Sequence, residues 1–287
     1  MERSSAMNDG ELSPTSSNTN LEQDSNDVDP APATGPTPPS PRFPSMPDHE
    51  GIVLHGLYDC KIIRNRDKVT KISALDGIKE SEAEVMRFVR EHTTIPVPRV
   101  HATTPTSITM DFIEGTTLEK AWNGLSDAAQ AEVSNQLRDY LNQLRAIKGS
   151  YIGGFGRTPA VDERSFSEEG GPFECEAEWN DFLLEGLIRS CPAILRSMIH
   201  SQLRTDHEIV LTHGDLHPSN IIVRDGRIVA LIDWENAGFY PEYLELIKPL
   251  RGPNWQVGYY HALLDIFPRR YDAEYLVDQF ISRLSSR

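Results

Sequence analysis

The sequence predicts an α+β fold with two lobes, a small sheet-rich lobe followed by a larger and mainly helical one. Two observations lead to this prediction. Between residues 51 and 115, short apolar segments with the composition of strands surround a single helical pattern. Beyond Gly115, apolar residues recur at helical spacing over longer stretches. We therefore expect one lobe over about residues 50–113 and a second over about 114–287, with a cleft between them.

Residues 1–49 are predicted to be a disordered acidic tail rich in Ser and Pro. The segment consists largely of Ser, Thr, Asn, Asp and Pro, and it has very few large apolar side chains. Such a composition cannot offset the conformational entropy that is lost on folding. Its Ser13-Pro14 and Thr37-Pro38 steps would suit a regulatory or docking arm, but a passive solvated extension is the favoured interpretation.

The small lobe is expected to begin with a hairpin, in which LYDCKII and KVTKIS flank a polar turn at residues 64–67. A helix is predicted for ESEAEVMRFVREH, because Val85, Phe88 and Val89 have helical spacing and acids occupy the first turn. Two prolines fix TIPVPRVH as an extended piece. SITMDFIEG is predicted to be a buried strand that ends at Gly115.

The second lobe is predicted from helical patterns and one hairpin. Thr116 and Glu119 form a plausible capping box for a helix at TTLEKAW. SDAAQAEVSNQLRDYLNQLRAI and CEAEWNDFLLEGLI predict two amphipathic helices. The strands NIIVR and RIVALI meet at Asp225-Gly226, a dipeptide that favours a tight hairpin turn. Residues 241–287 are predicted to be mostly helical.

The composition excludes several classes of partner. A net charge of -15 is unfavourable for binding nucleic acid, whose phosphates are held by clustered Lys and Arg. Three cysteines without CxxC spacing give no disulfide framework and suit a reducing compartment. No segment has the apolar run of a signal peptide or a membrane span. We therefore predict a cytoplasmic protein without nucleic-acid, membrane or obligate protein partners.

The stretch LTHGDLHPSNIIV concentrates polar residues between two apolar strings, namely His213, Asp215, His217 and Asn220. Three interpretations are open. The H-x-D-x-H pattern offers ligands for zinc, as in a zinc hydrolase. An aspartate followed by an asparagine five residues later suits a phosphoryl-transfer loop. The stretch also suits a polar turn between two strands.

Asp233 favours phosphoryl transfer among these interpretations. It directly follows the apolar run 228–232, at the position where a buried strand presents a carboxylate. Phosphoryl transfer from ATP requires an aligned acceptor oxygen, Mg²⁺ across the phosphates and cations on the nucleotide. In this interpretation Asp215 orients or deprotonates an acceptor hydroxyl group. Asn220 and Asp233 hold the metal through hard oxygen ligands.

Together, HGDLHPSNIIV and LIDWENAG resemble the catalytic and metal motifs of the aminoglycoside phosphotransferase and choline kinase-like family, which has a protein-kinase-like fold. VTKI, SEAEVMRFV, TIPVPRV and MDFIEGTTLEKAW follow the order of this family, so the resemblance covers roughly residues 51–250. GPFECEAEW and TIPVPRV resemble its fungal branch. The resemblance implies an ATP- and Mg²⁺-dependent phosphotransferase that acts on a hydroxyl group of a small molecule.

Position by position, the resemblance implies that Asp215 is the catalytic aspartate and that Asn220 and Asp233 are the Mg²⁺ ligands. Lys71, the third residue of VTKI, would bind the nucleotide phosphates. Glu82 would pair with this lysine, and Glu84 is the alternative if the register differs by a small shift. The hinge that meets the adenine is expected at three consecutive residues, Asp111, Phe112 and Ile113.

One feature departs from the family pattern. Kinase-like enzymes usually cover the phosphates with a glycine-rich turn, because glycine lets backbone N–H groups approach closely. The corresponding stretch here, GIVLHGLYDCKII, contains Gly51 and Gly56 but no G-x-G-x-x-G. A catalytically silent nucleotide- or ligand-binding protein is therefore the alternative. An active enzyme is preferred because the charged residues of the motifs are all present.

The remaining polar residues have competing interpretations. His213 is expected to support the loop by bonding to backbone, and a zinc site with His217 lacks a third soft ligand at recognisable spacing. Two interpretations are open for three acids, Glu235, Glu242 and Glu245. They either line an acceptor site for an amine-bearing substrate or form solvated surface, and the second interpretation is slightly favoured. Nothing in the sequence identifies the acceptor substrate.

Overall fold

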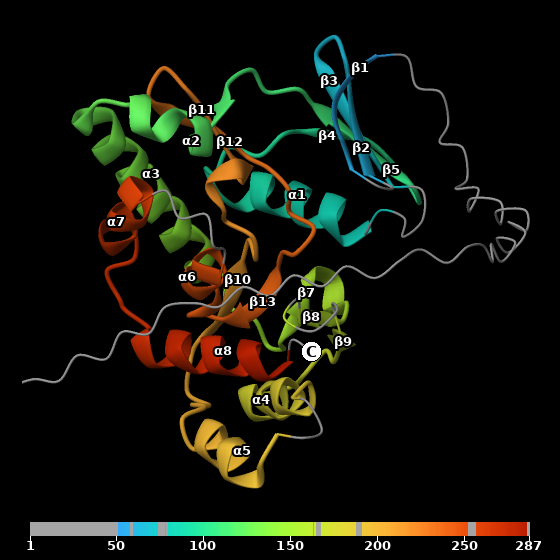
Figure 1. Ribbon diagram of the computed structural model, residues 1–287. Coiled ribbons are helices and arrows are strands. Elements are labelled where there is room, and N and C mark those ends of the chain that lie inside the picture. Colours follow the sequence, from blue (N-terminus) through green and yellow to red (C-terminus); the bar gives the residue numbers. More distant parts are fainter. Residues whose placement is uncertain are drawn as a thin grey trace, which may run out of the picture. The chain divides into compact units, whose positions relative to one another are not determined.

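The structure, a computed structural model, describes most of the sequence after Glu50. The described ranges are 51–57, 60–73, 78, 80–162, 164, 168–187, 191–251 and 257–285. The tail predicted for residues 1–49 lies outside them. The boundary predicted near residue 113 between two lobes stays a prediction, but the division into a sheet-rich first part and a helical second part is observed (Figure 1).

An antiparallel sheet of five strands, in the order β1-β2-β3-β5-β4, opens the described chain. The strands are β1 (Ile52–Leu57), β2 (Cys60–Asn65), β3 (Lys68–Ser73), β4 (Val100–Thr104) and β5 (Ser107–Asp111). The predicted hairpin is confirmed as β2 and β3, which turn at Arg66 and Asp67. The sequence prediction did not separate β1 from β2, and it began the first hairpin strand at Leu57, which belongs to β1.

As predicted, helix α1 (Glu80–His92) is the single helix among the described residues between 51 and 115 (Figure 1). It buries Ala83, Val85, Met86 and Val89. These side chains belong to a hydrophobic core that also contains Leu137 and many other residues of the second part of the chain. The sheet-rich and helical parts therefore share one core, and α1 is anchored in it.

The link between the two parts passes through Gly115. A Cβ atom at this position would lie 2.6 Å from Cγ2 of Ile222 and 2.7 Å from the carbonyl oxygen of Val223, so only glycine fits. The short strand β6 (Thr116–Thr117) follows and pairs with β11 (Ile221–Arg224). The predicted capping box is wrong, because Thr116 belongs to this strand and α2 (Leu118–Ala121) begins without a side-chain cap.

Most of the second part is helical. The longest helix, α3 (Asp127–Ala146), is confirmed, and the hydroxyl of Ser126 caps it by accepting a hydrogen bond from the N–H of Ala129. The other helices are η1 (Trp122–Gly124), η2 (Phe155–Arg157), α4 (Glu176–Glu185), α5 (Ala193–His200), η3 (Pro218–Asn220), α6 (Leu244–Ile247), η4 (Pro249–Arg251), α7 (Val257–Ile266) and α8 (Asp272–Ser285). None of the helices in the described ranges is long and apolar enough to cross a membrane.

Three further small sheets are formed by the residues that the structure describes. Their strand orders are β10-β13-β7, β12-β11-β6 and β8-β9. The additional strands are β7 (Gly153–Gly154), β8 (Ala160–Asp162), β9 (Glu168–Gly170), β10 (Ile209–Thr212), β12 (Arg227–Leu231) and β13 (Gly238–Pro241). The predicted hairpin is confirmed as β11 and β12. Its two turn residues, Asp225 and Gly226, have positive φ angles of 52° and 73°, as a tight hairpin turn of this kind requires.

Candidate active site

The loop that connects β10 to β11 contains the polar cluster of LTHGDLHPSNIIV. Gly214, the second residue of the loop after β10, has a φ of 78°. A Cβ atom at this position would lie 2.1 Å from the carbonyl oxygen of Asn236. Glycine is therefore required for the loop to lie directly against the chain that follows β12. The loop ends in η3, where the ring of His217 accepts a hydrogen bond from the N–H of Ser219.

Asn220 ties the end of this loop to Asp215. Its side-chain nitrogen donates to the backbone oxygen of Asp215 at 2.9 Å and to Oδ2 of the same residue at 2.8 Å. Asn220 is buried and Asp215 is partly buried. Because the nitrogen of the Asn220 amide is engaged by Asp215, its oxygen is the atom that faces other ligands.

His213 supports the loop from the protein interior. It is fully buried, its Nε2 lies 3.0 Å from the carbonyl oxygen of Ile232, and its Nδ1 accepts the N–H of Asp215 at 3.2 Å. Its ring also packs on Trp234, with ring centroids 4.4 Å apart. Burial lowers the pKa of His213 to about 4, so the imidazole is neutral at physiological pH.

Both ring nitrogens of His213 are thus engaged by backbone groups, which leaves neither for a zinc ion. In the described part of the chain, no group of three or more His, Cys, Asp or Glu side chains has an arrangement that could hold a metal. The zinc hydrolase interpretation therefore finds no ligand set in these residues.

Glu245 holds the same loop from α6. Its carboxylate accepts hydrogen bonds from the backbone N–H groups of His213, at 2.6 Å, and Gly214, at 3.3 Å. Burial raises the pKa of Glu245 to about 7, although these hydrogen bonds oppose the rise. The interpretation of Glu245 as solvated surface is wrong, because it is buried and bonded to the loop backbone.

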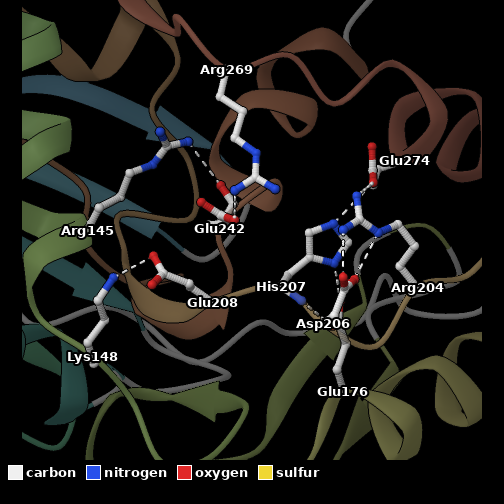
Figure 2. Close-up of polar contacts among 10 residues, drawn as sticks. All are labelled: Arg145, Lys148, Glu176, Arg204, Asp206, His207, Glu208, Glu242, Arg269 and Glu274. Carbon is white, nitrogen blue, oxygen red and sulfur yellow. Dashed lines mark hydrogen bonds and ion pairs between the residues drawn. The ribbon is translucent and has the colours of Figure 1, made fainter.

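Glu242 is also buried, so the same interpretation is wrong for this residue. Its carboxylate pairs with Arg269, and its backbone oxygen accepts a hydrogen bond from Arg145 (Figure 2). These contacts bind Glu242 to Arg269 and Arg145, and its carboxylate is paired with a cation of the protein itself.

Lys71 of β3 lies at the centre of a group of acids. Its Nζ atom is 3.2 Å and 3.3 Å from the two carboxylate oxygens of Glu82 on α1. It is also 2.7 Å from Oδ1 of Asp233 and 2.7 Å from Oε2 of Glu235. We refer to these four residues as the Lys71 cluster. The alternative partner, Glu84, is exposed, and its carboxylate lies beside Gly156 instead.

The acids of this cluster determine its protonation. Burial alone would lower the pKa of Lys71, but the carboxylates of Glu82, Asp233 and Glu235 outweigh burial and place the pKa above its ordinary value. The ammonium group is therefore charged at physiological pH. For Glu82, burial raises the pKa to about 7 against the opposing effect of Lys71.

Asp233 reaches this cluster through an unusual backbone conformation. Its φ angle is 65°, in the left-handed region that Asp tolerates better than most residues. The neighbouring residues fix this conformation, since the N–H of Ile232 donates to the backbone oxygen of Asn220 at 2.9 Å and Trp234 is fully buried. Strained residues of this kind often lie at functional sites.

A cavity of about 580 Å³ lies beside the Lys71 cluster. Its lining combines apolar side chains of the sheet, such as Val69 and Met110, with Asn220, Ile222 and Ile232 from the second part of the chain. The cavity lining also includes the residues predicted to form the site on the sequence, namely Lys71, Glu82, Asp111, Phe112, Ile113, Asn220 and Asp233. Asp215 is not part of this lining and joins the group through its hydrogen bond with Asn220.

Sequence reasoning missed two contributions to this site. Glu235 was considered only as an acceptor wall or solvated surface, and its contact with Lys71 was not anticipated. Glu245 was not recognised as the acceptor for the loop backbone. The motif IDWE was the only sequence feature that pointed to Glu235, and no local pattern pointed to the role of Glu245.

The chain is similar to known phosphotransferases in sequence and in structure. The model of the APH phosphotransferase enzyme family matches residues 69–280. The aminoglycoside phosphotransferase APH(4)-Ia has a similar structure, with a TM-score of 0.54 and 16% identity over 81% of this chain and 82% of that chain. The streptomycin-ATP-APH(2″)-IIa ternary complex has a TM-score of 0.50 and 13% identity, over 83% of this chain and 94% of that chain.

A thermostable mutant of APH(4)-Ia, in a ternary complex with ADP and hygromycin B, is similar at a TM-score of 0.53 and 16% identity, over 81% of this chain and 86% of that chain. At this level of identity the similarity concerns the fold. The predicted α+β, protein-kinase-like fold is thereby confirmed.

Proposed function

Because the chain belongs to the phosphotransferase enzyme family, we propose that it transfers the terminal phosphate of ATP to a hydroxyl group of a small molecule with the help of Mg²⁺. The observation that carries this proposal is the cavity in which Lys71, Asn220 and Asp233 lie together, with Asp215 bonded to Asn220 at its edge. A cation, oxygen ligands for a metal and a candidate base are the groups that phosphoryl transfer requires.

The cavity has the properties of a nucleotide site. Its volume of about 580 Å³ lies in the usual range for small-molecule sites. Apolar residues such as Val69 and Met110 can cover a flat base, and Lys71 offers a positive charge to phosphates. At the hinge, the N–H groups of Asp111 and Phe112 bond to Arg99 and Asp67, so Ile113 is the hinge residue that we expect to bond to the adenine.

The donor set also suits Mg²⁺, which prefers hard oxygen ligands. The carboxylate of Asp233 and the amide oxygen of Asn220 are the groups that would hold it. When bound, the metal would neutralise charge on the phosphates. Lys71 would bind phosphate oxygens, and Glu82 would orient its ammonium group. Asp215 would accept the proton of the acceptor hydroxyl group as ADP leaves.

The acceptor is proposed only as a hydroxyl-bearing small molecule. The similar structures include complexes with streptomycin and with hygromycin B, which makes these two compounds rational first acceptors. Their binding by those proteins does not extend to this chain, because the identity is low. The cytoplasmic location stays a prediction.

The Asp215→Asn variant tests the proposal. We expect this substitution to lower substrate-dependent ADP release by about 10²- to 10⁴-fold, because the general base is lost, while the affinity for ADP changes little. Asp225→Asn is the matched control, since Asp225 is exposed in the β11–β12 turn. ADP release would be measured with streptomycin, hygromycin B and a panel of sugars and amino alcohols.

Two outcomes would contradict the proposal. An unchanged rate in Asp215→Asn would remove Asp215 from the chemistry. If the protein binds ADP but forms no ADP from ATP with any acceptor, the result would instead favour the catalytically silent nucleotide-binding protein. That second candidate is motivated by the cavity edge at β1, where Leu54 and His55 stand in place of a glycine-rich turn.

A further inference from the structure

Lys71 has no spare hydrogen-bond donor in its present arrangement. An ammonium group carries three N–H donors. One is directed to Glu82, at 3.2 and 3.3 Å, one to Asp233 at 2.7 Å and one to Glu235 at 2.7 Å. A phosphate oxygen can therefore reach Lys71 only if one of these carboxylates leaves.

Glu82 is the least exchangeable of the three acids. Its side chain is 2% exposed and comes from α1, and Val85, Met86 and Val89 on the same side of this helix are anchored in the core. Moving this carboxylate away from Lys71 would leave it buried without its cation, which is strongly unfavourable. Asp233 is also restrained, because its short side chain extends from a backbone with a φ of 65° that its neighbours fix.

Glu235 differs from both. Its side chain is the most exposed of the three, at 44%, and it is one methylene longer than that of Asp233. Because its carboxylate is the one most accessible to water, Glu235 loses the least when solvent replaces Lys71 as its partner. Glu235 is therefore the partner that Lys71 releases at the lowest cost.

Polar side chains lie beside Glu235 on the side away from the larger cavity's lining residues. Glu235 lines a second, small cavity of about 20 Å³, on the side of α1 and β13. Ser81, Asn236 and Lys248 line the same cavity. Rotation of the Glu235 side chain toward these hydroxyl, amide and ammonium groups would keep the carboxylate solvated or hydrogen-bonded.

We propose that Glu235 is the carboxylate that a nucleotide phosphate displaces from Lys71, so that Glu235 sets the affinity of the site for phosphorylated nucleotides. The inference rests on the proposed function, since it assumes that nucleotides bind in the larger cavity. Before a phosphate arrives, Glu235 compensates the charge of the largely buried ammonium group. On binding, the phosphate takes over that compensation.

The test compares the affinities for ADP and adenosine, measured by titration calorimetry in the presence of Mg²⁺. We expect Glu235→Gln to bind ADP about three to ten times more tightly than the unmodified protein, because the competing carboxylate is gone. Adenosine lacks phosphates, so its affinity should change less than about twofold. Glu84→Gln is the matched control, because it removes an exposed charge from α1 that has no contact with Lys71.

Glu235→Asp separates contact from charge. This variant keeps the negative charge but shortens the side chain, so the displacement mechanism predicts that it also binds ADP more tightly. ADP affinity equal to that of the unmodified protein in Glu235→Gln would overturn the inference. The same holds if Glu235→Asp behaves like the unmodified protein, or if adenosine tightens as much as ADP. Failure of both ADP and adenosine to bind any of the proteins would overturn the proposed function itself.

Discussion

Two charged clusters of the fold differ in how they balance their charges. In the Lys71 cluster, one ammonium group faces three carboxylates, and two of these, from Asp233 and Glu235, are partly exposed. The cluster borders the larger cavity. Its carboxylates outnumber its single cation.

The second cluster, which we call the α8 cluster, consists of Asp162, Arg164, Arg251 and Asp278. Arg164 bonds to both oxygens of Asp162, at 2.8 and 3.0 Å, and to Asp278 at 3.1 Å. Arg251 bonds to both oxygens of Asp278, at 2.9 and 2.6 Å. Two guanidinium groups thus face two carboxylates, and the side chains of Asp162, Arg164 and Asp278 are at most 5% exposed.

The two clusters serve different purposes in the fold. In the α8 cluster, opposite charges are equal in number and are paired with good geometry, which a buried cluster requires for stability. In the Lys71 cluster, the surplus of carboxylates is compatible with folding because part of it is exposed. Removing a charge should therefore reduce stability at the α8 cluster and change ligand affinity or activity at the Lys71 cluster.

The largest effect is expected from Asp278→Asn. This substitution leaves Arg164 and Arg251 without their shared carboxylate, and breaking a buried ion pair costs about 3–5 kcal/mol. The free energy of unfolding, measured by denaturant titration, should fall by that amount, whereas the affinity for ADP at low temperature should not change. Asp272→Asn is the control on the same helix, because Asp272 pairs with Arg270 at the surface and its loss should cost less than about 1 kcal/mol. Equal losses in the two variants would remove the contrast between the clusters.

An intermediate effect is expected from Glu82→Gln, and it should concern activity more than stability. Because burial already raises the pKa of Glu82 to about 7, loss of its charge should lower the free energy of unfolding by less than about 2 kcal/mol. Lys71 would lose its orienting partner, so kcat/KM should fall by about 10- to 100-fold, the equivalent of a hydrogen bond to a charged group. Glu84→Gln should leave both quantities unchanged.

The pH dependence of kcat/KM provides a second measurement of the same variant. Glu82 is charged above its pKa and protonated below it, so the activity of the unmodified protein should fall as the pH decreases through about 7. Glu82→Gln cannot be protonated there and should lack this acid limb. An identical pH profile in both proteins would show that the charge of Glu82 does not orient Lys71.

The same comparison explains what the sequence could predict. Some elements depend mainly on residues that are neighbours in sequence, and the sequence predicts them correctly. These are the polar loop with Asp215 and Asn220, the hairpin turn at Asp225 and the helix α3. Contacts that close the site were not predictable, because Lys71 and Glu235 are 164 residues apart in sequence and the loop reaches Glu245 only through the fold. The capping box at Thr116 failed for the same reason, since its backbone pairs with the distant strand β11.

The smallest effect is expected beside the α8 cluster, at His207. Figure 2 shows its buried ring between Glu176 of α4 and Glu274 of α8, with Arg204 and Asp206 nearby. Nδ1 lies 2.7 Å from Glu176 and Nε2 lies 3.1 Å from Glu274, and the ring packs against Tyr243. Burial alone would lower the pKa of His207, but the hydrogen bonds and charges of these two acids outweigh burial and raise it above its ordinary value.

This direction fixes the sign of a pH effect on stability. Because the pKa of His207 is higher in the folded than in the unfolded protein, its contribution is complete below the unfolded pKa of about 6.5 and is lost as the pH rises through the folded pKa. The melting temperatures of the unmodified protein and of His207→Gln should therefore differ most at acidic pH, by no more than about 2–4 °C. At basic pH the two melting temperatures should converge. A difference that grows with pH would show that His207 is neutral in the folded protein. In that case the imidazole of His207 would contribute no charge near α8, and it would bond to Glu176 of α4 and Glu274 of α8 as a neutral group.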